Sequence, residues 1–201
     1  IGANMAVNHP VLFNRVRRRR TDHAAARVIV VDPRRSMTAE HADLHVPVAP
    51  GGDVALLQWL ARRMLDAGRV DEAYVEGHTR GWAEHRDHLA QLDLNDVARR
   101  SGVPQDVLDE LFGVVRDANR LLSLYCMGTN QSRRGTDKNT ALINLHLMTG
   151  QVGRPGCGPF SLTGQPNAMG GREVGYLAHQ LPGYRRVDRV DERSDIEDAW
   201  G

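Results

Sequence analysis

The fold of this chain is decided by the stretch Leu121-Leu122-Ser123-Leu124-Tyr125-Cys126-Met127-Gly128-Thr129-Asn130-Gln131. Its first six residues form a mostly apolar run, which predicts a strand that ends in a polar, glycine-containing turn. The pattern of Asn139–Thr149 predicts a helix soon afterwards. A strand, a polar turn and a helix in this order are typical of parallel α/β folds.

A long loop rich in glycine and proline follows this unit. Residues Gly150–Gly175 include eight glycines and three prolines, but also Phe160, Leu162 and Met169. A merely flexible linker would lack these apolar residues, and long loops inside compact domains tend to be functional. Glycines would let a ligand approach the backbone closely. Hydrogen-bonding side chains near or in the loop are Asn130, Gln131, Gln165, Asn167 and Arg172. Composition alone leaves a second interpretation open, a loop that packs between subdomains.

The N-terminal part of the chain predicts further strand and turn units. Gly2-Ala3-Asn4-Met5 reads as the turn after a strand already under way. Asn8 and Pro10 predict the start of a helix. The β-branched run Arg27–Val31 predicts a strand that is buried on both faces and ends in Asp32-Pro33-Arg34.

Together these units predict a doubly wound parallel sheet, which is a Rossmann-like α/β fold. Ligands of such sheets bind beyond the carboxyl ends of the strands, so we expect Asn4, Asp32 and Met127 to lie at one edge. Ala42–Val48 alternates in polarity and carries a proline near its end, which predicts a short edge strand. Asp53 is predicted to cap the helix Val54–Ala67.

Composition and charge argue against several classes of protein. The 201 residues fit one large domain, or one domain with an appendage. Because 26 basic and 25 acidic residues leave a net charge of +1, a nucleic-acid partner is not expected. Cys126 and Cys157 lack CxxC spacing and cannot by themselves build a zinc or iron–sulfur site. No run approaches the length of a membrane span, and neither a P-loop nor a complete GxGxxG motif is present.

Two groups of histidines could suggest a metal site. His85 and His88 stand three residues apart but outside an HExxH motif. His41, Asp43 and His45 share one face of the predicted edge strand. Polar surface residues are the more ordinary interpretation of both groups, so we expect no metal ligand in this chain.

Several segments resemble one known family of enzymes. They are Met127–Gln131, Arg134-Gly135, Asn144-Leu145-His146-Leu147, Gly150–Ser161 and Thr163–Gly175. In these segments the chain resembles bacterial molybdenum nitrate reductases, which belong to the molybdopterin oxidoreductase family. Met169–Gly175 is most similar to the assimilatory, cytoplasmic branch. The resemblance covers nearly the whole chain and implies a central piece of a larger multidomain enzyme.

The resemblance implies a role for particular residues. Gly2, Ala3, Asn4 and Met5 would contact the phosphates of a pterin dinucleotide, and Asp32, Pro33 and Arg34 would contact its nucleoside end. Gly52 and Asp53 would lie at its guanine. The remaining dinucleotide contacts would come from Met127, Gly128, Thr129, Asn130 and Gln131. Arg172 would lie near the substrate funnel, where a planar guanidinium suits nitrate. Residues 1–150 would form the α/β dinucleotide-binding core, and residues 151–201 the cofactor and substrate loop with a partial extension.

The implied activity is the two-electron reduction of nitrate to nitrite by a molybdenum bis(molybdopterin guanine dinucleotide) cofactor. An iron–sulfur cluster is expected in the parent enzyme but without ligands from this chain, and an electron-donor protein or reductase subunit is an expected partner. The isolated chain should therefore be inactive. Two alternatives remain open: the same domain of a formate dehydrogenase-like enzyme, and a binding module without catalysis.

Overall fold

The computed structural model describes residues 1–164, 168–176 and 179–201, so Gln165 and Asn167 of the predicted loop lie outside the described residues. The chain divides into two compact units, Ile1–Leu162 and Thr163–Gly201, and each is described by itself. None of the described helices combines the length and the apolar character needed to cross a bilayer.

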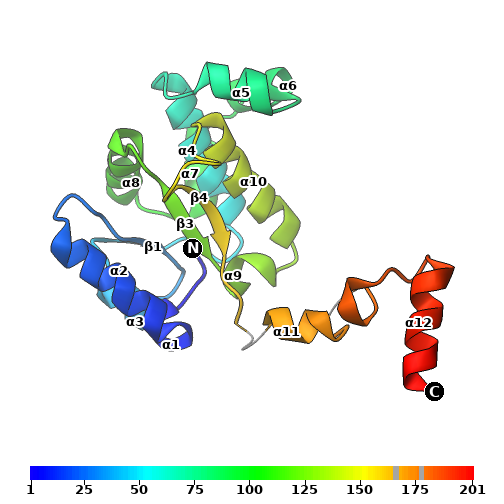
Figure 1. Ribbon diagram of the computed structural model, residues 1–201. Coiled ribbons are helices and arrows are strands. Elements are labelled where there is room, and N and C mark those ends of the chain that lie inside the picture. The colour runs from blue at the N-terminus through cyan, green and yellow to red at the C-terminus, as the bar shows by residue number, and fades with distance from the viewer. Residues whose placement is uncertain (165–167, 177–178) are drawn as a thin grey trace. The chain divides into compact units, whose positions relative to one another are not determined.

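The first unit has a mixed α/β architecture in which helices predominate (Figure 1). Its strands are β1 (Ile29–Val31), β2 (Leu44–Val46), β3 (Leu122–Tyr125) and β4 (Gly158–Ser161). Its helices are α1 (Met5–Asn8), α2 (Pro10–Asp22), α3 (Met37–Glu40), α4 (Asp53–Asp66), α5 (Glu72–His78), α6 (Trp82–Ala90), α7 (Leu94–Ser101), α8 (Gln105–Asp117), α9 (Met127–Asn130) and α10 (Gly135–Met148).

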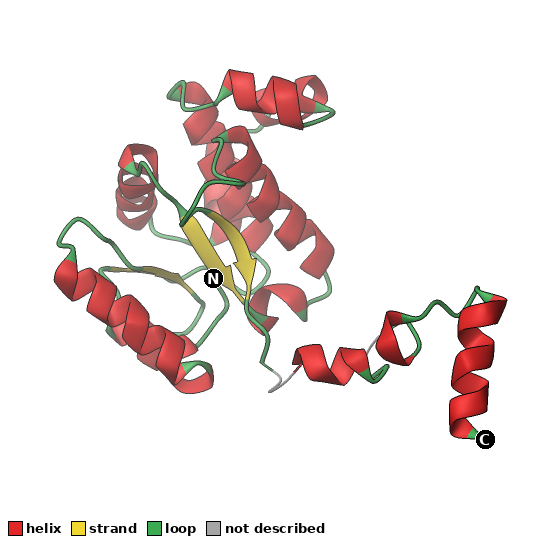
Figure 2. Cartoon of the chain, viewed as in Figure 1, coloured by secondary structure: helices red, strands yellow, loops and turns green. Residues whose placement is uncertain are grey.

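The described strands form two small parallel sheets instead of the single doubly wound sheet predicted from the sequence (Figure 2). β1 pairs with β2 so that Val30 lies opposite His45, and β3 pairs with β4 so that Leu124 lies opposite Phe160. Ile1 and Gly2 connect the two sheets, because the Ile1 nitrogen donates to the Leu124 carbonyl (2.7 Å) and the Gly2 N–H donates to the Val31 carbonyl (3.0 Å). These hydrogen bonds lie between the two sheets, and each sheet consists of two paired strands.

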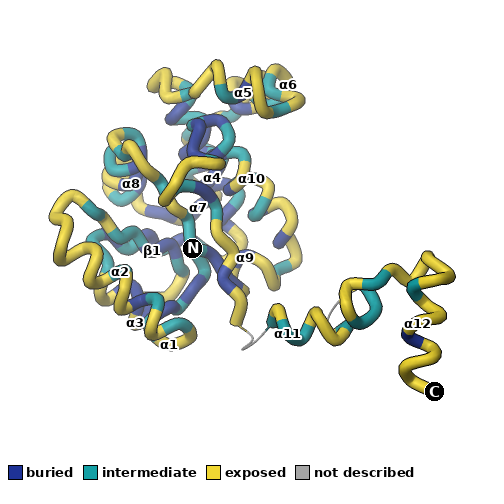
Figure 3. The backbone as a smooth tube through the Cα atoms, in the orientation of Figure 1, coloured by how far each residue is buried: buried dark blue, intermediate teal, exposed yellow. Residues whose placement is uncertain are grey.

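Side chains from the two faces of β3 enter different apolar clusters. Tyr125 belongs to the larger cluster, in which β1 and β2 pack with α4, α7, α8 and α10. Cys126 belongs to the smaller cluster, together with Met5 of α1 and Phe13 of α2, and Leu124 packs against this cluster. Neighbouring residues of a strand point to opposite faces, so the two faces of β3 contact different clusters, although Leu122 is exposed. α4 lies in the buried interior (Figure 3).

Several local predictions need correction. α2 begins at Pro10 as expected, but the residue before it is His9, and Asn8 ends the short helix α1. Asp53 is the first residue of α4 and not its cap, which is Gly52. The predicted loop contains the strand β4, whose Pro159 is tolerated because proline can occupy an edge strand.

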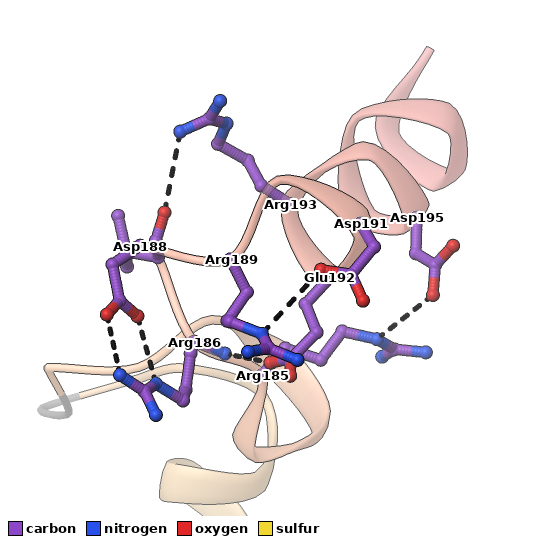
Figure 4. Close-up of polar contacts among 9 residues, drawn as sticks. Arg185, Arg186, Asp188, Arg189, Asp191, Glu192, Arg193 and Asp195 are labelled. Carbon is purple, nitrogen blue, oxygen red and sulfur yellow. Dashed lines mark hydrogen bonds and ion pairs between the residues drawn. The ribbon is translucent and has the colours of Figure 1, made fainter.

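The second unit is helical and strongly charged. Its elements are α11 (Ala168–Glu173), a 3-10 helix (Pro182–Tyr184) and α12 (Val190–Trp200). Arg186 donates two hydrogen bonds to Asp188, at 2.9 and 2.6 Å, and Arg185 lies 3.7 Å from Asp195 (Figure 4). Solvent screens ion pairs as exposed as these, and each of them contributes little. They therefore do little to stabilise the unit.

Candidate functional site

The turn that follows Ile1 packs against α9 through two glycines. The Gly128 N–H donates to the Gly2 carbonyl (3.1 Å). A Cβ added to Gly128 would lie 2.8 Å from the Gly2 Cα, and one added to Gly2 would lie 2.9 Å from the Gly128 Cα. Gly2 also has a positive φ of 55°, which disfavours other residues. The two turns can approach this closely only because both residues lack a side chain.

A buried ion pair connects α10 to the start of α4, and its lysine also contacts α9. The Lys138 ammonium lies 2.7 Å from Asp53 Oδ2 and 3.4 Å from the Gly128 carbonyl. Lys138 is 6% exposed and Asp53 is 9% exposed. Among the described residues, Asp53 Oδ1 has no hydrogen-bond partner, so it remains available as an acceptor. The interaction was not predicted, although Lys138 is the only lysine in the sequence.

The side chain of Asn4 is held by α3. The Thr38 hydroxyl donates to Asn4 Oδ1 (2.9 Å) and accepts from the Ala6 N–H (2.9 Å). Ala3 and Met5 are buried in the smaller apolar cluster. Of the four predicted phosphate-binding residues, Gly2 to Met5, only Asn4 therefore has a polar side chain, and that side chain is already oriented by Thr38.

Asp32 lies directly after β1, next to the strand end that Gly2 contacts. Its Oδ1 accepts from the Arg34 N–H (2.9 Å), which forms a turn of the kind that Asp favours. Its carbonyl oxygen lies 2.9 Å from His45 Nε2. Pro33 and Arg34 are exposed. Asn4 thus follows the residues Ile1 and Gly2, which hydrogen-bond to the strand before Asp32 and to the strand before Met127.

α9 presents a polar surface after β3. Met127, Gly128, Asn130 and Gln131 are exposed, and Asn130 Nδ2 donates to Ser161 Oγ (3.4 Å). Thr129 is the exception, because it is 1% exposed and its hydroxyl has no partner among the described residues. A buried hydroxyl without a partner is unusual.

α10 is anchored to β3 behind this surface. His146 is fully buried, and its Nε2 lies 2.8 Å from Ser123 Oγ. Burial lowers the pKa of His146 to about 4, so the imidazole is neutral at physiological pH. α10 also carries Lys138, and its attachment to β3 therefore helps to fix the position of the ammonium.

Arg172 belongs to the second unit. It lies in α11 of the second unit and is exposed. Within the described ranges, Arg172 forms no ion pair with Glu173 or another carboxylate. The guanidinium is therefore not held in place by a structural partner within those ranges.

The histidine groups show no metal-binding geometry. The described residues contain no cluster of three His, Cys, Asp or Glu side chains that could hold a metal ion. Asp43 is paired with Arg20 and accepts from the Val28 N–H. His88 contacts Gln58.

The comparisons with known proteins agree on one family. The profile of the Molybdopterin oxidoreductase family matches residues 1–197. The chain is 43% identical over 200 residues to a nitrate reductase of Synechocystis sp., covering 100% of this chain and 28% of that protein. It is 43% identical over 199 residues to an assimilatory nitrate reductase of Haloferax mediterranei, covering 99% and 27%. It is 38% identical over 214 residues to a periplasmic nitrate reductase of Desulfovibrio desulfuricans, covering 100% and 28%.

A solved structure shows a similar fold. Acetylene hydratase from Pelobacter acetylenicus superposes with a TM-score of 0.57 at 23% identity, over 64% of this chain and 18% of that one. The chain spans about a quarter of the length of the nitrate reductases named above. The family resemblance predicted from the sequence is confirmed, because the family profile covers nearly every residue. The chain belongs to the molybdopterin oxidoreductase family.

Proposed function

We propose that this chain is the segment of a molybdenum-dependent nitrate reductase that binds a molybdopterin guanine dinucleotide. Support for nitrate as the substrate comes from the named relatives, which are nitrate reductases at 38–43% identity over the whole chain. Support for dinucleotide binding comes chiefly from one observation: Asp53 is a buried carboxylate whose Oδ2 is paired to Lys138, while its Oδ1 has no partner in the part of the chain that the structure describes.

The residues of the first unit fit such a ligand. The close contact of Gly2 with Gly128 leaves backbone, without side chains, at the junction of two turns. Exposed polar groups of Asn130 and Gln131 lie beside it. Guanine carries N–H donors on one edge, and a carboxylate is an acceptor-only group that complements them. Hydrogen bonds to an ionised acceptor are stronger than those between neutral groups.

The proposal includes every contact with the dinucleotide and with nitrate that the sequence resemblance implies. The turn Gly2–Met5 and the turn Asp32–Arg34 bind the phosphates and the nucleoside end, and α9 orients the dinucleotide. Asp53 accepts from the guanine. Arg172 attracts and orients nitrate with its forked donors. When bound, the cofactor supplies the chemistry: nitrate takes up two electrons and two protons, and gives nitrite and water.

The architecture of the parent protein is also part of the proposal. The two small sheets act as halves of one doubly wound sheet, because Ile1 and Gly2 hydrogen-bond to both. Residues 1–150 form the dinucleotide-binding core, and residues 151–201 the cofactor and substrate loop. The cofactor is the bis(guanine dinucleotide) form. An iron–sulfur cluster elsewhere in a cytoplasmic parent enzyme receives electrons from a donor protein or reductase subunit.

The test uses the full-length parent enzyme with Asp53→Asn. This variant keeps the volume and a hydrogen-bond acceptor for Lys138 but removes the carboxylate. Acid-released guanine nucleotide and molybdenum are measured per folded molecule, beside thermal unfolding. The proposal expects a large loss of guanine nucleotide, whereas Asp66→Asn, which removes an exposed carboxylate at the other end of α4, should lose none.

A normal guanine content in Asp53→Asn would contradict the proposed contact. The wild-type enzyme is also assayed with nitrate and with formate. Turnover of formate without turnover of nitrate would favour the formate dehydrogenase-like alternative over the nitrate reductase.

A further inference from the structure

Lys138 is a buried cation with no role in the function proposed above. It extends from α10 to contact two elements that precede it in the sequence, the first turn of α4 and the α9 turn. Burying an ammonium is costly unless it is paired and hydrogen-bonded. Lysine offers three donors on a compact head. The Asp53 carboxylate and the Gly128 carbonyl account for two of them.

We propose that Lys138 is a positioning residue for the cofactor site: it fixes Asp53 with Oδ1 free and ties the start of α4 to the α9 turn. This inference rests on the proposed function. The Lys138 ammonium at Oδ2 is the counter-charge of the buried Asp53 carboxylate. A carboxylate only accepts hydrogen bonds, which is the property that a guanine edge requires.

The contact with Gly128 gives Lys138 its second effect. Gly128 also packs against Gly2, so displacement of its carbonyl would disturb the junction of the two turns. Loss of the ammonium would therefore act on the guanine contact and on the turns that bind the phosphates. It would do so without touching any ligand atom itself.

The experiment compares three variants of the full-length parent enzyme: Lys138→Met, Asp53→Asn and the double variant. Methionine approximates the length of the lysine stem and removes the charge. We expect Lys138→Met to weaken dinucleotide binding about tenfold, which corresponds to about 1.4 kcal/mol, and so to lower acid-released guanine nucleotide per folded molecule. Because Lys138 acts partly through Asp53 and partly through the Gly128 carbonyl, the double variant should hold less nucleotide than Asp53→Asn, but more than the two single losses multiplied together.

The matched control is Arg62→Met. Arg62 forms the other ion pair of α4, with Asp66 at 2.8 Å, and bonds to the carbonyl of Ala90 (2.7 Å). This variant should lower the melting temperature and leave the nucleotide content per folded molecule unchanged. A purely structural Lys138 would behave in the same way, and that result would overturn the inference.

The outcomes separate the inference from the proposed function. Normal nucleotide in Asp53→Asn would contradict the proposed function itself. Loss in Asp53→Asn but not in Lys138→Met would overturn only the role of Lys138. If Lys138→Met does not fold, the double variant decides, since it leaves no buried charge unpaired. A nucleotide content in the double variant equal to that of Asp53→Asn would then overturn the inference, because the contact of Lys138 with Gly128 would have no effect on the site.

Discussion

Gly128→Ala tests whether the junction of the two turns is needed for cofactor binding. The new Cβ would lie 2.8 Å from the Gly2 Cα and 2.9 Å from the Gly2 oxygen. Carbon atoms in favourable contact are about 3.5–4.0 Å apart, so the turns must separate by roughly half an ångström or more. The opposing atoms are backbone and cannot rotate away. Forcing an extra methyl group into such a contact costs about 1–3 kcal/mol.

The assay measures thermal unfolding and guanine nucleotide per folded molecule in the full-length enzyme. We expect Gly128→Ala to lower both. Gly113→Ala is the matched control, because Gly113 lies inside α8 and its added Cβ would meet nothing within 4 Å. Alanine is favoured over glycine inside a helix by about 0.5–1 kcal/mol, so the control should be stable and fully loaded. A Gly128→Ala enzyme with normal stability and normal nucleotide content would refute the reasoning.

Three further predictions concern other parts of the chain. His146 has a pKa of about 4 when folded and about 6.5 when unfolded, so the unfolded state binds the proton more readily and stability falls as the pH drops from about 6.5 to 4. Relative to His146→Gln, the free energy of unfolding of the wild type should fall by about 3 kcal/mol over this range. Thermal melts of both proteins between pH 7.5 and 4 measure this difference, and equal shifts of the two melting temperatures would contradict it. Arg172→Ala should lower kcat/KM for nitrate about ten- to a hundredfold with normal molybdenum content, and Arg172→Lys should recover part of the loss; an unchanged KM with a lower melting temperature would assign Arg172 to the scaffold. Gly52→Ala would place a Cβ 2.6 Å from the Ser101 carbonyl, so it should lower the melting temperature, and a melt identical to wild type would show that the contact relaxes freely.

The sequence located β1, β2 and β3 because their signals are local. β1 and β3 lie inside the apolar runs predicted for them, and α10 overlaps its predicted segment. β4 was missed because glycine and proline are poor strand formers. Its pairing with β3 depends on residues more than thirty positions away.

The contacts that organise the candidate site could not be read from the sequence. Asp53 before a helical pattern satisfies the local rule for a cap. Its actual partner, Lys138, is 85 positions further along the chain. The sequence shows that Gly2 and Gly128 are glycines but not that they face each other. Such pairings are set by tertiary packing, which local patterns do not encode.

The most direct test of the account is a structure of the full-length enzyme with its cofactor bound. The account predicts that the guanine of one dinucleotide donates to Asp53 Oδ1 while Lys138 stays on Oδ2. It also predicts that the dinucleotide contacts the turns Gly2–Met5 and Asp32–Arg34 and helix α9. A bound dinucleotide that leaves Asp53 and these turns in contact with protein alone would contradict the central claim.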